Sequence, residues 1–210
     1  MTAATAAVLF CGGALSAVPG LVWVRSGRWQ RAGEPNAAAP WWWVVLAGLG
    51  VVVVWWRLGD QSRWPAAAAA ALLVVVGGAG VLIDVAVKRV PEPLVLGLYA
   101  ASGVLLGGGA LVTGQWGHLG RAVATGAVAW LCFFLYALIT RLGFADVQLM
   151  GLCALVLGWV GWWPAVMVGP VVLAVGGAAA VVLLILGRRG TFPFAPAVLA
   201  GFLITIAVYT

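Results

Sequence analysis

Charged residues are scarce in this sequence, and acidic residues are the scarcest. Only 8% of the 210 residues are charged, whereas a soluble domain carries about 25%. Hydrophobic residues make up 65% of the chain. This composition excludes an ordinary soluble domain. It predicts an all-α protein, a polytopic bundle of transmembrane helices that forms one integral membrane domain over residues 1–210.

Cysteine is also rare, and its placement limits the chemistry. Cys11, Cys132 and Cys153 lie in apolar stretches and form no Cys-x-x-Cys pair, so the usual zinc and redox motifs are absent. We interpret all three as small buried hydrophobic side chains, and we expect neither a metal site nor a cofactor. The N-terminal stretch lacks the positively charged segment of a signal peptide, so the first apolar run should be a retained helix.

The 11 basic residues give the chain a net charge of +6. They form no basic stripe and no aromatic–basic motif of the kind that binds nucleic acids. They gather instead in the short segments between apolar stretches, where cationic side chains lie next to lipid. We therefore expect the lipid bilayer to surround the chain, and we expect no nucleic-acid partner.

Apolar stretches of roughly membrane-spanning length alternate with short polar segments. They predict eight helices, at about 3–24, 38–56, 65–85, 93–113, 122–140, 147–162, 164–186 and 195–209. The division between the sixth and seventh helices follows from Gly161-Trp-Trp-Pro164, which interrupts an apolar run of about forty residues. Tryptophans cluster at both ends of the second expected helix, where interfacial indoles belong; they are Trp41, Trp42, Trp43, Trp55 and Trp56.

Basic residues are divided unequally between the two sides that this arrangement creates. One side holds eight, Arg25, Arg28, Arg31, Lys88, Arg89, Arg141, Arg188 and Arg189, and the other holds three, Arg57, Arg63 and Arg121. Cytoplasmic loops are enriched in Lys and Arg. The asymmetry therefore predicts that both termini lie outside and that the loop with Lys88 and Arg89 lies inside, where these two side chains can also contact lipid headgroups.

Two of the five acids, which are Glu34, Asp60, Asp84, Glu92 and Asp146, border apolar helices. Asp84 ends one apolar run and Asp146 begins another. A charged side chain at the centre of a membrane helix costs roughly 3 kcal/mol or more, so acids at membrane depth are functional candidates. The topology places both at one depth on the cytoplasmic side, although they belong to the third and sixth expected helices. Glu34 and Asp60 are interpreted as solvated loop acids.

Other polar residues are weaker candidates. His118 is expected in a polar turn with Gln115 and Arg121, on the opposite side from both acids, so we interpret it as a solvated loop histidine and not as a metal ligand. Ser102, Thr113 and Thr125 have no base near them in this topology, which argues against a serine protease.

Three short motifs resemble those of the type IV prepilin peptidases, membrane aspartic proteases of the Gly-x-Gly-Asp class. Asp84 with Lys88-Arg89-Val90-Pro91 is similar to the family's aspartate, basic stretch, aliphatic residue and Pro-Asn. Gly143-Phe-Ala-Asp146-Val-Gln-Leu resembles its Gly-x-Gly-Asp-Val-Lys-Leu, and Pro193-Phe-Ala-Pro196 resembles its Pro-Phe-Gly-Pro turn. The resemblance covers about residues 75–205. It implies that Asp84 and Asp146 are the catalytic pair, supported by Lys88, Arg89, Pro91, Gly143, Ala145, Pro193 and Pro196.

Four positions depart from the family's pattern. Ala145 and Ala195 replace glycines, Gln148 replaces lysine and Glu92 replaces asparagine. Ala145 matters most, because alanine restricts the backbone beside Asp146; an inactive homologue in pilus assembly is therefore one alternative. The loop after the first expected helix has about 15 residues and no cysteine. The resemblance is thus to the short form, for which we expect no zinc and no S-adenosylmethionine-dependent methylation.

The resemblance implies an endopeptidase that cleaves the leader of prepilin-like precursors at the cytoplasmic face of a bacterial inner membrane, in pilus assembly or secretion. Two carboxylates at one site do not both ionise readily, so one can draw a proton from water while the other donates to the scissile carbonyl. The main alternative is a small proton- or cation-coupled transporter that uses the same two aspartates. Transporters, however, tend to place such acids near the membrane midplane on broken helices.

Overall fold

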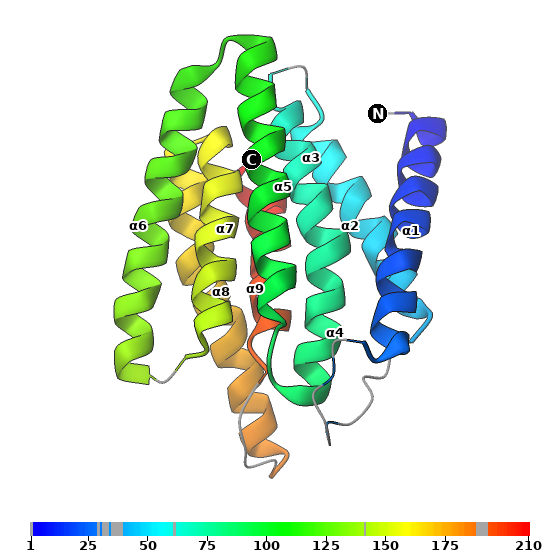
Figure 1. Cartoon of the computed structure of the whole chain (residues 1–210), viewed down its shortest axis with the longest axis vertical. Coiled ribbons are helices and arrows are strands. Elements are labelled where there is room, and N and C mark those ends of the chain that lie inside the picture. The colour runs from blue at the N-terminus through cyan, green and yellow to red at the C-terminus, as the bar shows by residue number, and fades with distance from the viewer. Residues whose placement is uncertain are drawn as a thin grey trace.

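The computed structural model describes residues 2–28, 30, 34, 40–60, 62–140, 142–187 and 193–210. Within these ranges the chain forms a bundle of helices that run up and down one long axis (Figure 1). The elements are α1 (Ala3–Ser26), α2 (Trp42–Leu58), α3 (Trp64–Leu72), the π-helical segment η1 (Leu73–Gly77), α4 (Gly78–Val87), α5 (Glu92–Thr113), α6 (Trp116–Thr140), α7 (Phe144–Val160), α8 (Trp162–Ile185) and α9 (Ala195–Tyr209).

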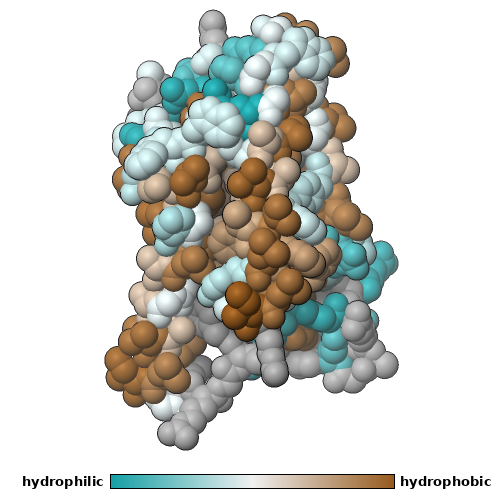
Figure 2. Space-filling view, turned by 90° about the vertical axis from the view of Figure 1, so that its left-hand side faces the viewer, coloured by the Kyte–Doolittle hydropathy of each residue, from teal (hydrophilic) through white to brown (hydrophobic). Residues whose placement is uncertain are grey.

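Eight continuous helices result in the described ranges, because α3, η1 and α4 form a single span, Trp64–Val87. Five helices are long and apolar enough to cross a membrane, and three, α2, α7 and α9, are apolar but shorter. Large apolar side chains such as Leu111, Ile139 and Ile185 lie exposed on the outer surface, and hydrophobic residues dominate the middle of the face shown in Figure 2. The predicted all-α membrane bundle is confirmed.

The helix α6 begins six residues earlier than expected, so the predicted polar turn lies partly inside it. His118 is helical and half-buried, with its ring 5.7 Å from that of Trp159 in an edge-to-face arrangement, so its interpretation as a solvated loop residue is wrong. Arg121 donates from Nε to the Gly158 carbonyl at 2.7 Å and from Nη2 to the Trp159 carbonyl at 2.6 Å. These carbonyls belong to the last turn of α7, which has no intrahelical donors for them.

Burial differs from the expectation for two cysteines and one tryptophan. Cys153 is buried, but Cys11 and Cys132 are exposed on the outer sides of α1 and α6. Membrane helices are apolar towards lipid as well as towards the core, so an apolar neighbourhood does not predict burial. Trp43, expected at the interface, is also buried. It packs so closely on Gly78 that any side chain at residue 78 would overlap its ring.

One end of the bundle, which we call the aspartate end, is where α1, α4, α6 and α8 finish and α5, α7 and α9 begin (Figure 1). The helices Ala3–Ser26 and Gly78–Val87 bring Arg25, Arg28, Lys88 and Arg89 to this end, and Arg57, Arg63 and Arg121 lie at the other. Four basic residues used in the topology prediction, Arg31, Arg141, Arg188 and Arg189, lie outside the described residues.

Candidate functional site

Asp84 lies three residues before the end of α4 and is 5% exposed. Its Oδ2 accepts a hydrogen bond from the backbone N–H of Ala195 at 3.0 Å. Ala195 is the first residue of α9, so the carboxyl faces the N-terminus of another helix. Free N–H groups and the helix dipole both favour a negative charge at that position. A carboxylate from one span is therefore held by the beginning of another.

The motif Pro193-Phe-Ala-Pro196 makes this contact. Phe194 is the N-cap of α9, and Pro196 occupies its first turn, where a residue without an N–H costs nothing because the N–H would have no intrahelical partner. Ala195, between them, supplies the N–H that Asp84 accepts. Any residue except proline can donate this bond, so alanine in place of the family's glycine preserves it.

Asp146 is the third residue of α7, whose N-cap is Gly143. Gly143 has extended backbone angles, φ −64° and ψ 142°, which any residue can adopt. The lack of a side chain matters for a different reason: a Cβ at residue 143 would lie only 3.0 Å from Oδ2 of Asp146, so the carboxyl would have to move slightly. The loop therefore lies close against the carboxyl.

Asp84 and Asp146 line the same two cavities at the aspartate end. The smaller, of about 290 Å³, also touches Lys88, Glu92 and Gln148. The larger, of about 650 Å³, extends along α6 and α8 and reaches Tyr136 and Phe194. The fold therefore brings together the two acids that the sequence singled out, from spans separated by about sixty residues.

The loop after α4 closes the smaller cavity on one side. Lys88 ends α4 in the left-handed conformation, with φ 56°, and its N–H donates to the Asp84 carbonyl at 2.7 Å. Arg89 forms a two-pronged ion pair with Glu34, with bonds of 2.8 and 2.6 Å. Glu34 is thus not the solvated acid we expected. Arg89 is 55 residues away in the sequence, so no local pattern predicts this ion pair.

Gln148 is the other polar side chain buried at this site. It is 9% exposed and lines the smaller cavity, and its Oε1 finds no hydrogen-bond partner among the described residues. Tyr99 of α5 holds the adjoining backbone, because its hydroxyl donates to the Gln148 carbonyl at 2.7 Å. An amide group can both donate and accept hydrogen bonds. Gln148 can therefore form hydrogen bonds with a peptide group at the cavity wall, a role that its place in the motif did not indicate.

The remaining candidates lie elsewhere. Asp60 is exposed, as expected, and accepts bonds from the backbone N–H groups of Ser62 and Arg63 before α3. Thr113 and Thr125 donate to backbone carbonyls. Among the described residues, His, Cys, Asp and Glu form no group of three or more that could hold a metal ion.

Ala145, the most important departure from the family's pattern, lies in the first turn of α7 with helical geometry. Alanine favours this geometry, so its methyl group restricts the backbone only to the conformation that it already has. Pro91 is the N-cap of α5, and the acidic Glu92 begins that helix, a position at which a negative charge is favourable.

The chain matches no family model, and no curated protein or solved structure is significantly similar to it.

Proposed function

We propose that this chain is a membrane aspartic endopeptidase that removes the leader of prepilin-like precursors. One observation carries the proposal: two partly or fully buried carboxyls, Asp84 and Asp146, come from distant spans and line the same cavities at one end of the bundle. Burying two acids together costs free energy, so their presence at one site indicates a function. The motif resemblance, present at both acids and at the turn that binds Asp84, supplies the reaction class.

The chemistry needs only the two acids and a water molecule. The ionised carboxyl takes a proton from water as the water oxygen attacks the scissile carbonyl, and the protonated carboxyl donates to the carbonyl oxygen. The resulting tetrahedral diol collapses as a proton passes to the leaving nitrogen. No covalent enzyme intermediate forms. Because the two carboxyls interact, they titrate as a pair.

The proposed substrate is a membrane protein with a short basic leader that ends in glycine before a hydrophobic helix. We place the aspartate end at the cytoplasmic face of a bacterial inner membrane. The orientation follows from the positive-inside rule applied to Lys88, Arg89 and the other basic residues of that side. Labelling of single cysteines with an impermeant reagent tests it: Lys88→Cys in a cysteine-free chain should react only after the membrane is permeabilised. Reaction of intact cells at residue 88 would reverse the orientation.

Leader removal from a co-expressed prepilin, followed by a gel shift, tests the activity. Asp84→Asn and Asp146→Asn should each remove nearly all cleavage. Asp60→Asn is the matched control, because it makes the same substitution in an exposed acid near Arg63, away from the cavities. Normal processing by either of the first two variants would exclude that residue from the mechanism.

The same variants distinguish the transporter alternative. Asp84 lies near the end of α4 and Asp146 in the first turn of α7, whereas transporter acids usually lie near the midplane. Reconstituted protein should therefore show no proton or cation flux that depends on these acids. Flux that is lost in both Asn variants, with prepilin processing unchanged, would favour the transporter.

A further inference from the structure

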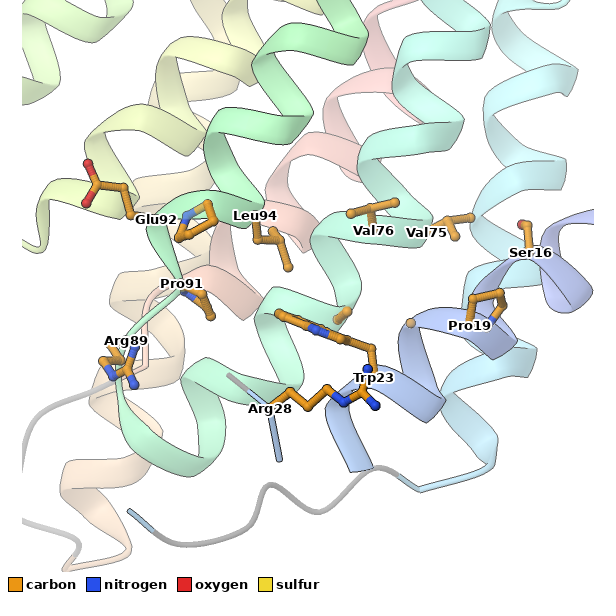
Figure 3. Close-up of a pocket in the computed structure, with 13 residues that line it drawn as sticks. Ser16, Pro19, Trp23, Arg28, Val75, Val76, Arg89, Pro91, Glu92 and Leu94 are labelled. Atoms are coloured by element: carbon orange, nitrogen blue, oxygen red, sulfur yellow. The ribbon is translucent and has the colours of Figure 1, made fainter. Parts of the chain in front are cut away.

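A separate cavity of about 730 Å³ lies between α1, the span that contains η1, and the start of α5. Figure 3 shows Trp23 reaching into it from α1, opposite Val76 and Leu94. Neither aspartate lines it. Its volume falls in the range of about 300–1,000 Å³ that is typical of small-molecule sites. Ser16, Pro19 and Pro93 are lining residues that are themselves exposed, so the cavity is open to the surroundings of the bundle.

The inner wall of this cavity is apolar. It consists of Val75, Val76 and Ala79 from the span that contains η1, Gly20 from α1 and Leu94 from α5. The cavity follows α1 from Ser16 to Trp23, which is about 10 Å along the helix axis. An elongated apolar wall of this length, inside a membrane bundle, suits a hydrocarbon chain.

The cavity becomes basic towards the aspartate end. Arg28 and Arg89 both line it there, and the Arg28 side chain lies beside the Trp23 indole (Figure 3). Arg89 is bound to Glu34, which neutralises part of its charge. Glu92 also lines the cavity, but in Figure 3 its carboxylate points away from the other labelled side chains. None of the ion pairs found among the described residues involves Arg28, so its guanidinium brings a positive charge to this end of the cavity.

We propose that this cavity binds one anionic phospholipid. An acyl chain would lie against Val75, Val76 and Leu94, and the phosphate would lie at the Arg28 guanidinium, with the Trp23 indole at the boundary between the two. Basic pockets between membrane helices at the cytoplasmic side are suited to anionic headgroups, and indoles favour the level of the headgroups. The charge favours a phospholipid over an uncharged amphiphile. The proposal does not depend on the peptidase activity.

Native mass spectrometry of the purified full chain, titrated with phosphatidylglycerol or phosphatidylcholine of the same acyl chains, tests the site. The unmodified chain should bind one phosphatidylglycerol more tightly than phosphatidylcholine. Gly20→Leu should abolish that binding, because a Cβ at residue 20 already lies 3.5 Å from Ala79 and the rest of leucine would fill the cavity. Gly12→Leu is the matched control on the same helix, where an added Cβ meets nothing within 4 Å.

The charge requirement has its own pair of variants. Arg28→Gln should weaken phosphatidylglycerol binding roughly fivefold, the effect expected for one basic residue at an anionic headgroup. Lys88→Gln removes the same charge from the same end of the bundle but outside this cavity, and it should change binding much less. Equal losses in the two variants would indicate general surface attraction and would overturn the proposal.

A measurement on the unmodified chain keeps the test independent of variant folding. Phosphatidylglycerol with a photoactivatable acyl chain should crosslink to peptides that contain Val76 or Leu94. Crosslinks confined to other helices, equal binding of phosphatidylcholine, or unchanged binding by Gly20→Leu would each overturn the site. If the spectra showed dimers of the chain with no bound phospholipid, the cavity would be assigned to a second copy of the chain. That result would also overturn the proposal.

Discussion

At the end of the bundle opposite to the aspartates, the Arg121 guanidinium donates two hydrogen bonds to the final carbonyls of α7. At the aspartate end, Asp84 accepts one bond from the start of α9, and both it and Asp146 border open space. Both arrangements place a charge where the helix dipole favours it. They differ in what the charge can still bind.

Arg121 completes backbone hydrogen bonds that the helix cannot complete itself, which is a structural task. Each carboxylate has two oxygens and about four acceptor positions, so the bond from the Ala195 N–H leaves Asp84 with acceptor positions to spare. A charged group beside a cavity with unused acceptors is placed to bind water or a peptide. Removing a charge should therefore affect stability at one end and activity at the other.

The largest expected effect is on cleavage by the aspartate variants. Asp84→Asn or Asp146→Asn should lower the cleavage rate by about 10²-fold or more, the usual contribution of general acid–base groups. The double variant should lie within about threefold of either single one, because each deletes an indispensable part of one unit. Rates of leader removal under single-turnover conditions measure both. Multiplicative losses would show that the two acids act separately.

The same aspartate variants should remain folded. An amide costs less to bury in a membrane protein than a carboxylate, so the thermal midpoint in mild detergent should stay the same or rise. A large fall in the midpoint would mean that the two acids have a structural role like that of Arg121, and the contrast between the ends would disappear.

Arg121→Met should show the reverse pattern. It removes two hydrogen bonds from a charged donor and leaves the carbonyls of Gly158 and Trp159 without them. We expect a loss of roughly 2–4 kcal/mol in stability, with near-normal cleavage by the protein that remains folded. Arg28→Met, at an exposed loop position, is the control and, in detergent without added phospholipid, should change stability by less than about 0.5 kcal/mol. Equal unfolding midpoints in the two variants would contradict the structural role.

Gly143→Ala tests the close contact beside Asp146. The added Cβ would lie 3.0 Å from Oδ2 of Asp146, so the carboxyl has to shift. Small displacements of a reacting group are costly, and we expect about a tenfold loss of cleavage with little change in the unfolding midpoint. Gly107→Ala is the control, since a Cβ there meets nothing within 4 Å. Full activity in Gly143→Ala would show that the carboxyl position is not critical.

The helices were predictable because long apolar runs have few interpretations. The start of α6 was not, because Arg121 looks like a loop residue until its partners, the last carbonyls of α7, are known. The burial of Cys11 and Cys132 was predicted wrongly for a related reason. In a membrane protein the lipid-facing and core-facing residues are both apolar, so the sequence lacks the polar stripe that marks the outside of a soluble helix.

At the candidate site, the sequence indicated the two acids through their rarity and their motifs. Two expected helices separate the loop after Asp84 from the loop before Asp146, so both loops were expected on the same side of the membrane. Their catalytic role stays a prediction. The Ala195 N–H and the Glu34–Arg89 pair were not predictable, because each joins residues far apart in the chain. A backbone donor carries no side-chain signal at all, so the function of the Pro193-Phe-Ala-Pro196 turn required the structure.

The smallest expected effect belongs to Ala145→Gly. The sequence suggests that glycine here leaves cleavage unchanged or raises it. Ala145 is helical in the first turn of α7, a conformation that alanine adopts without strain. Glycine at this position therefore relieves no strain, and it weakens the helix by about 1 kcal/mol or less. We therefore expect a cleavage rate within about twofold of the original, measured beside Gly143→Ala on the same prepilin. A rise of more than tenfold would mean that this turn leaves the helical conformation during catalysis. Loss of cleavage in a folded Ala145→Gly variant would show that the motif around Asp146 is aligned incorrectly with the peptidase family.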